Sequence, residues 1–208
     1  MIKVNNLSIY DLYKNINLEL QRDKIYFLSG VSGSGKSTLL KIFTRFITPD
    51  SGEIVIDGKN IKKYKDTDLR RKITLIPQSS VIYEGNLLDN LNIGNTFRGE
   101  KFNYNYAVKL LSILLPEKSM DQKPENFSTG EKKRVSILRS LLVNANFFLF
   151  DEPTTGLDKN SCSRTIQTIV NILRERGVGG IIVTHEKDLL NIGDKIIYIR
   201  EKEVFIDG

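Results

Sequence analysis

One glycine-rich segment constrains the fold of this chain more than any other feature of its sequence. Residues 30–37 read Gly-Val-Ser-Gly-Ser-Gly-Lys-Ser, which matches the pattern G-x-x-x-x-G-K-[ST]. The segment follows a short apolar run at 25–28 and precedes a stretch that we expect to be helical from about 36 to 46. A strand, a glycine-rich loop and a helix in this order predict a phosphate-binding loop beside a buried, mainly parallel sheet.

The residue types of this loop suit phosphate binding better than the alternative, a flexible turn. Glycine permits the backbone conformations in which successive N–H groups point toward phosphate oxygens, and the helix start adds a positive dipole end. Lys36 is expected to reach the β- and γ-phosphates, and the Ser37 hydroxyl to bind Mg²⁺. We expect phosphate contacts from Gly30, Ser32, Gly33, Ser34, Gly35, Lys36, Ser37 and Thr38.

A second candidate site is the acidic pair that follows another apolar run. Asp151 and Glu152 come directly after Phe-Phe-Leu-Phe at 147–150, which we expect to be a buried strand. Ligands of open α/β sheets bind at the carboxyl ends of the strands. Asp151 is therefore expected to hold Mg²⁺, directly or through water, and Glu152 to take a proton from an attacking water. An acidic turn before Pro153 is the alternative.

The remaining patterns place these sites in an α/β chain with a helical insertion. Further strands are expected at 16–20, 54–56, 73–76, 181–184 and 196–199. Between about 86 and 144 the pattern is helical. We predict one domain across the 208 residues, with a catalytic core at about 1–77 and 146–208 and a helical subdomain at about 78–145.

Composition argues against several classes of protein. The single cysteine, Cys162, excludes an internal disulfide framework and a multi-cysteine zinc site. No apolar run approaches the roughly 18–20 residues that span a bilayer, and the first residues lack the apolar core of a signal peptide. We therefore expect a cytoplasmic protein. The net charge of +6 permits an anionic partner, but we interpret it as solvated lysine-rich faces.

Further motifs, taken together and in order, resemble those of the ATP-binding cassette (ABC) ATPases. Residues 127–131, Phe-Ser-Thr-Gly-Glu, are similar to the L-S-G-G-Q signature of that family. Gln78, after Leu-Ile-Pro, resembles its Q-loop, and Thr-Gly-Leu-Asp at 155–158 resembles its D-loop. His185, in Val-Thr-His-Glu, resembles its switch histidine. The resemblance covers nearly the whole chain.

The resemblance implies a fold, two cofactors and a role for each motif. It implies a P-loop NTPase (RecA-like) core with an N-terminal antiparallel β portion and an inserted α-helical subdomain, acting on ATP with Mg²⁺. Ser128 and Gly130 would contact the γ-phosphate of ATP held by a second subunit. Gln78 would sense Mg²⁺ or the attacking water, and His185 would contact the γ-phosphate. Asp158 would lie at the dimer seam.

The adenine contact is expected from an aromatic residue upstream of the loop. Tyr10 and Tyr13 both qualify, and we favour Tyr10. Core packing on a strand is the alternative for either side chain.

The signature departs from the family pattern at two positions. Thr129 replaces a glycine with a β-branched residue, and Glu131 replaces glutamine with a negative charge. The basic residues at 132–134 are expected to offset that charge. Ser128 and Glu131 also have the spacing of a capping box, which predicts a helix start here.

Residues 81–90, Val-Ile-Tyr-Glu-Gly-Asn-Leu-Leu-Asp-Asn, are similar to the segment that exporters of this family place after the Q-loop. The resemblance implies an ATPase subunit of an exporter, peripheral on the inner face of the cell membrane. It would form a homodimer or heterodimer and bind an integral membrane subunit on a separate chain, unless the chain is a shortened one. Nucleic acid is not an expected partner. The alternatives are a soluble ABC-type ATPase acting on nucleic acid or protein assembly, and a binding-only regulator.

Overall fold

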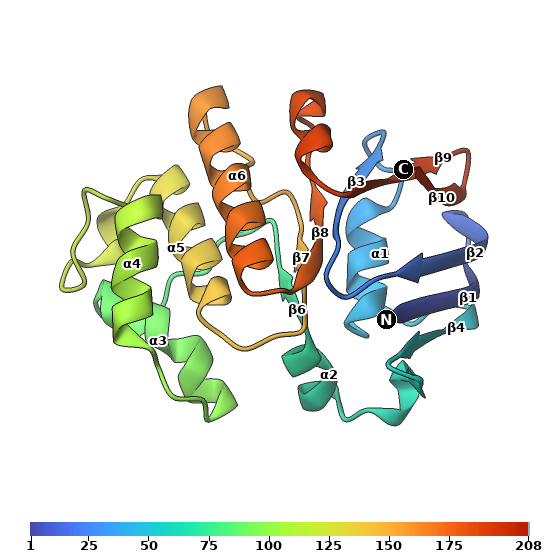
Figure 1. Ribbon diagram of the computed structural model, residues 1–208, viewed down its shortest axis with the longest axis horizontal. Coiled ribbons are helices and arrows are strands. Elements are labelled where there is room, and N and C mark those ends of the chain that lie inside the picture. Colours follow the sequence, from blue (N-terminus) through green and yellow to red (C-terminus); the bar gives the residue numbers. More distant parts are fainter. Residues whose placement is uncertain (208) are drawn as a thin grey trace. The chain divides into compact units, whose positions relative to one another are not determined.

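A computed structural model describes residues 1–207, with the strands and helices drawn in Figure 1. The strands are β1 (Ile2–Ile9), β2 (Tyr13–Leu20), β3 (Ile25–Gly30), β4 (Ser51–Ile56), β5 (Lys59–Asn60), β6 (Ile73–Ile76), β7 (Phe147–Phe150), β8 (Gly179–Val183), β9 (Lys195–Arg200) and β10 (Glu203–Asp207). The α-helices are α1 (Lys36–Phe43), α2 (Asp66–Lys72), α3 (Leu87–Arg98), α4 (Tyr104–Leu114), α5 (Thr129–Leu141) and α6 (Lys159–Glu175). Short 3₁₀ turns are η1 (Ile61–Lys63), η2 (Pro124–Asn126) and η3 (Lys187–Ile192).

Two sheets form the β structure. The larger has the order β10-β9-β3-β8-β7-β6, in which β3 runs parallel to β8 and β9, and β7 runs parallel to β8. The smaller has the order β2-β1-β4-β5 with antiparallel pairs. The predicted fold class, with a mainly parallel sheet and an N-terminal antiparallel portion, is confirmed.

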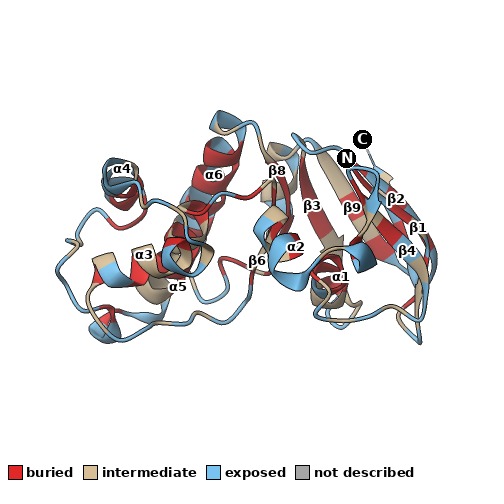
Figure 2. Cartoon of the chain, turned by 90° about the horizontal axis from the view of Figure 1, so that it is seen from below, coloured by how far each residue is buried: buried red, intermediate tan, exposed pale blue. Residues whose placement is uncertain are grey.

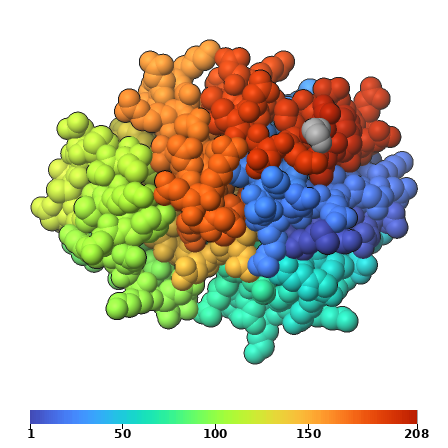
Figure 3. Space-filling model, in the orientation of Figure 1, coloured from blue at the N-terminus to red at the C-terminus, as the bar shows by residue number. Residues whose placement is uncertain are grey.

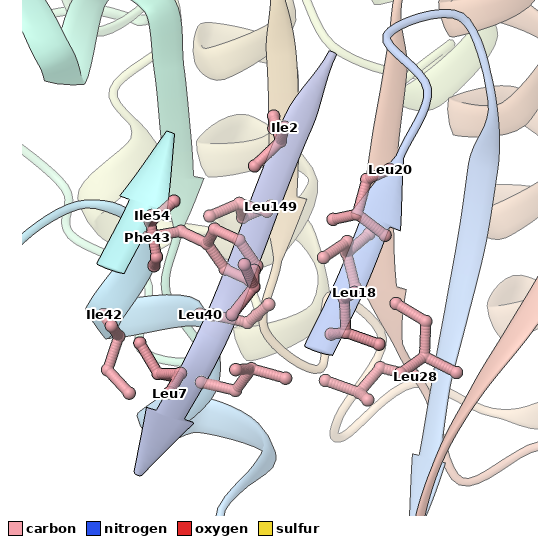
Figure 4. Close-up of a cluster of buried hydrophobic side chains, with 14 of the residues drawn as sticks. Ile2, Leu7, Leu18, Leu20, Leu28, Leu40, Ile42, Phe43, Ile54 and Leu149 are labelled. Carbon is pink, nitrogen blue, oxygen red and sulfur yellow. The ribbon is translucent and has the colours of Figure 1, made fainter. Parts of the chain in front are cut away.

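The main hydrophobic core lies where the antiparallel strands, α1 and the central parallel strands meet (Figure 4). From residue 16 to residue 20 of β2, every second side chain is apolar and buried, as the alternation in the sequence predicts. Leu40 and Phe43 of α1 are fully buried in the same cluster. Figure 2 shows these buried positions in red along β1, β2 and β4. This packing fixes the position of α1, the helix that begins at the end of the glycine-rich loop.

The chain divides into two compact units. The first contains Met1–Leu75, Ala145–Glu152 and the chain from Val170 onward, and the second contains Ile76–Asn144 and Pro153–Ile169. The expected boundary differed in one segment, because 153–169 was assigned to the core. Within the second unit, Leu157 packs against the signature segment, since a Cβ at Gly130 would lie 2.7 Å from a methyl carbon of Leu157.

In the second unit, α5 contacts both α3 and α4, and the three helices lie near one another in Figure 1. The helical pattern expected between 86 and 144 is therefore confirmed as α3, α4 and α5. In the first unit, the N-terminal segment (blue) adjoins the C-terminal segment (red) in Figure 3. The backbone N–H of Lys14 donates to the carbonyl of Lys202 at 3.4 Å.

One expected helix is shorter than its sequence pattern. We expected a helix to about residue 46, but α1 ends at Phe43. Arg45 has a φ of 56°, which breaks the helix, and the buried Thr44 hydroxyl bonds back to the carbonyl of Lys41 at 3.2 Å. Within residues 1–207, no helix has both the length and the apolar character that a membrane span requires.

Candidate functional site

The glycine-rich loop joins β3 to α1 and is closed by its own lysine. Lys36 Nζ donates to the carbonyl oxygens of Gly30 at 2.8 Å and Val31 at 2.9 Å. Gly33 and Gly35 have φ values of 78° and 94°, which a side chain would strain. A Cβ at Gly33 would meet no atom within 4 Å, so this side of the loop is open. The loop thus offers an ammonium group and an open backbone face to an anion.

Tyr13 lies directly against this loop from within the core. A Cβ at Gly35 would collide with the Tyr13 hydroxyl, so only glycine fits here. Tyr13 is 1% exposed, and burial raises its pKa. Tyr10, in contrast, is 83% exposed. Core packing, the alternative weighed for both tyrosines, therefore describes Tyr13, and Tyr10 is the one available to a ligand.

A cavity of about 560 Å³ lies beside the loop, within the first unit. Its lining includes Asp11 and Leu12, which follow Tyr10, and Val31, Gly33 and Ser34 of the loop. The cavity therefore connects the exposed tyrosine's segment with the open face of the loop.

The side chains of Asp151 and Ser37 place two oxygen atoms suited to a metal ion next to each other. The Ser37 hydroxyl donates to Asp151 Oδ1 at 2.8 Å, and Asp151 is buried at the end of β7. Residues 1–207 hold no cluster of three or more His, Cys, Asp or Glu side chains suited to a metal. A hydroxyl and one carboxylate fit Mg²⁺, which takes few protein ligands when phosphate oxygens and water complete its shell.

Glu152 and His185 form the second pair at this edge of the sheet. Strands β7 and β8 run parallel with Phe150 opposite Ile182, so the residues after both strands lie side by side. His185 Nε2 lies 2.8 Å from Glu152 Oε1. Glu152 has a φ of 48°, an uncommon conformation for a residue with a side chain. The backbone thus turns the Glu152 carboxylate toward His185 instead of letting it follow the strand.

The second unit contains the other predicted site residues. Gln78 follows β6 and is exposed, and the buried Lys133 of α5 donates through Nζ to its carbonyl and, at 3.4 Å, to that of Pro77. We expected the basic residues 132–134 to offset the charge of Glu131. The ammonium group of Lys133 bonds to the backbone of the Gln78 segment.

The predicted capping box at Ser128 is confirmed. Ser128 Oγ accepts from the Glu131 N–H at 3.3 Å, and the Ser128 N–H donates to Glu131 Oε2 at 2.7 Å. These bonds fix the start of α5, with Gly130 in its first turn. A helix start presents backbone N–H groups that attract anions.

Asp158 has a local structural role. Its carboxylate accepts from the N–H groups of Asn160 at 3.1 Å and Ser161 at 3.0 Å, at the start of α6. The hydrogen bond from the Ser161 hydroxyl holds the pKa of Asp158 below its usual value. The D-loop residue therefore begins a helix, as Ser128 does.

The structure thus gathers the predicted residues in two places. The first unit brings together the glycine-rich loop, Asp151, Glu152 and His185. The exposed Tyr10 belongs to the same unit. The second unit holds Gln78, Ser128, Gly130 and Asp158. Sequence reasoning missed Lys118, which contacts Glu131, and the contact of Lys133 with Gln78. Neither lysine lies in a pattern that could have revealed its partner.

Residues 13–155 match the family model described as "ABC transporter". The chain is 30% identical over 190 residues to the probable iron export ATP-binding protein FetA of Escherichia coli, covering 91% of this chain and 84% of FetA. It is 33% identical over 200 residues to the putative hemin import ATP-binding protein HrtA of Staphylococcus haemolyticus, covering 93% and 90% of the two chains.

Solved structures agree. The ATP-binding cassette MJ0796, in a dimeric post-hydrolysis state with ADP and Pi, superposes with a TM-score of 0.84 at 28% identity, covering 100% of this chain and 98% of that one. A bacterial Atm1-family ABC exporter with ATP bound has the same fold, with a TM-score of 0.83 over 98% of this chain and 38% of the exporter chain.

Proposed function

The chain belongs to the ABC transporter family as an ATP-hydrolysing subunit that powers a membrane transporter, and we propose that it works as one half of a head-to-tail dimer. The observation that carries the ATPase activity is the pair of contacts at the carboxyl edge of the sheet. The Ser37 hydroxyl lies 2.8 Å from Asp151 Oδ1, next to the phosphate-binding loop. His185 Nε2 lies 2.8 Å from Glu152 Oε1.

ATP binding uses the first unit. The backbone N–H groups of residues 30–38 would hold the phosphates, and Lys36 would exchange its contacts with Gly30 and Val31 for phosphate oxygens. Ser37 and Asp151 would hold Mg²⁺, and Gln78 is proposed as a further Mg²⁺ ligand on the family resemblance alone. Bound Mg²⁺ supplies charge neutralisation at the β- and γ-phosphates. Tyr10 would stack on adenine at the mouth of the neighbouring cavity.

Hydrolysis uses the acidic pair and the histidine. Glu152 accepts a proton from the attacking water as general base. His185 fixes the orientation of the Glu152 carboxylate through their 2.8 Å contact and is 56% exposed, so its ring can also turn toward a γ-phosphate. Both residues project from ends of adjacent parallel strands, which keeps them in place.

The signature of one chain completes the site of the other. The first turn of α5, with Ser128 and Gly130, offers N–H groups to the γ-phosphate bound by a partner, and Asp158 lies at the seam. The dimeric state of the related cassette MJ0796 supports this arrangement. The partner is a second copy or a related chain.

The membrane partner is proposed as a separate integral membrane subunit of an exporter, with this chain peripheral on the cytoplasmic face. FetA, whose length this chain covers to 84%, is named as an export ATP-binding protein, and residues 81–90 resemble the exporter segment. HrtA is named for import, so the direction of transport rests on the exporter-like segment.

Glu152→Gln tests the proposal. The variant should bind ATP as tightly as the wild type but hydrolyse it about 100-fold more slowly, since a general base contributes roughly 10²-fold or more. ATP should therefore hold it as a dimer, measured by size exclusion with light scattering. Lys36→Ala, the control, should neither bind ATP nor dimerise.

Two results would contradict the proposal. Wild-type turnover by Glu152→Gln would remove the general base. ATP-stabilised dimers that bind DNA or RNA in a salt-sensitive way, and that retain no integral membrane protein from native membranes, would favour the soluble alternative.

A further inference from the structure

Glu131 is the residue of the signature that differs most in charge from the family pattern, and it has a specific partner. Lys118 Nζ lies 2.7 Å from Glu131 Oε1, and their side chains are 21% and 23% exposed. The other carboxylate oxygen, Oε2, accepts from the Ser128 N–H at 2.7 Å. Both oxygens are thus bonded within the same unit. The hydrogen bond from Lys118 is the main reason that the pKa of Glu131 falls to about 2.

Lys118 also contacts the first residue of the signature. Its Nζ lies 4.5 Å from the centroid of the Phe127 ring, in a cation–π geometry, and Phe127 is buried. One lysine between α4 and η2 therefore contacts two of the five signature residues, at both ends of the motif. Lys133, nearer in sequence, is directed instead to the carbonyl groups of Pro77 and Gln78.

The charge of Glu131 has a consequence for phosphate binding. The carboxylate sits in the first turn of α5, where it stabilises the helix dipole but also opposes an incoming triphosphate. Two like charges several ångströms apart near a protein surface repel by an amount that changes an equilibrium about tenfold or more. An ammonium group bonded to the carboxylate removes most of this repulsion while leaving the capping box intact.

We propose that Lys118 is a positioning residue of the signature, which neutralises Glu131 and so allows Ser128 and Gly130 to receive the γ-phosphate of the partner's ATP. Lys118 itself does not touch the nucleotide. The inference rests on the proposed head-to-tail dimer, in which this helix start meets ATP bound to the other chain.

The test is a double-mutant cycle made in the Glu152→Gln chain, in which ATP-bound dimers are expected to accumulate. Four variants are compared in that background: Lys118→Met, Glu131→Gln, the combination of both, and Lys123→Met as control. Lys123 is an exposed lysine five residues along the same segment, so it matches the charge removed. The measurements are the ATP concentration that gives half-maximal dimer and the affinity of the monomer for ADP.

Lys118→Met should raise the ATP concentration for half-maximal dimer about tenfold at low salt, because the Glu131 charge is exposed to phosphate. The increase should shrink at high salt, where ions screen the repulsion. The combined variant should return to within about twofold of the parent, since glutamine carries no charge and still completes a capping box. Lys123→Met and the ADP affinities should not change.

Equal dimerisation of Lys118→Met and its parent would overturn the inference. So would a combined variant as impaired as Lys118→Met alone, because Lys118 would then act only by packing on Phe127. If the Glu152→Gln parent forms no dimer with ATP, the proposed function itself fails, and this inference falls with it.

Discussion

At the scale of single residues, the contact between Tyr13 and Gly35 ties the core to the phosphate-binding loop. The Tyr13 hydroxyl is buried and, within residues 1–207, has no hydrogen-bond partner. A buried hydroxyl without a partner loses its bonds to water and gains none in return. Tyr13 therefore supports the loop through its ring, and its hydroxyl is a local cost to stability.

Tyr13→Phe should keep the free energy of unfolding unchanged or raise it by about 1 kcal/mol, because it removes that hydroxyl and keeps the ring. Tyr13→Ala, the matched comparison, should lower it by about 3–5 kcal/mol through the cavity left behind. Urea unfolding measures both, and ATP affinity of Tyr13→Phe should match the wild type. A clear loss of stability in Tyr13→Phe would show that the hydroxyl has a partner in solution.

At the scale of elements, α5 connects two motifs that lie far apart in the sequence. Its first turn carries the signature, and its buried Lys133 holds the carbonyl groups before and at Gln78. A movement of the Gln78 segment would therefore be transmitted to the signature helix through the hydrogen bonds that Lys133 donates to these carbonyl groups.

Lys133→Met should release the Gln78 segment while preserving the volume of the buried side chain. Backbone amides at 78–80 should then exchange with deuterium faster, and the free energy of unfolding should fall by about 1.5–3 kcal/mol, the usual effect of losing a hydrogen bond to a charged group. Lys132→Met, the neighbouring control, should exchange as the wild type does. Unchanged exchange in Lys133→Met would mean that other contacts hold the segment.

The sequence predicted those elements whose signals are local. The glycine-rich loop, the capping box at Ser128 and the buried strand before Asp151 each depend on neighbouring residues, and all are found. Strand β1 was not predicted, because bulges between Val4 and Ile9 interrupt the alternation that marks a strand.

The contacts of Lys118 and Lys133 could not be predicted for a different reason. A lysine side chain has many rotamers, and its partner depends on which loops the fold brings near. Lys133 bonds to a carbonyl 55 residues away in the sequence, and no periodic pattern encodes such a distance. The sequence could identify the charge of Glu131 as unusual, but the structure was needed to find what neutralises it.

At the scale of the whole molecule, the residues for one reaction are divided between the two units of the chain. The phosphate-binding loop and Glu152 belong to the first unit, and Ser128 and Gly130 to the second. In a symmetric head-to-tail pair, each chain therefore supplies one half of each of two sites. This division predicts that two differently damaged chains can repair each other.

Lys36→Ala removes the phosphate-binding lysine and keeps the signature, whereas Ser128→Arg blocks the signature and keeps the loop. Each variant alone should hydrolyse ATP at background rate. In an equimolar mixture, half of the encounters bring together one chain of each kind, and such a mixed pair has one intact site of two. Roughly a quarter of the wild-type activity should therefore return. A phosphate-release assay measures it, with both variants first shown to be folded by circular dichroism. A mixture no more active than its separate components would mean that one chain completes its own site.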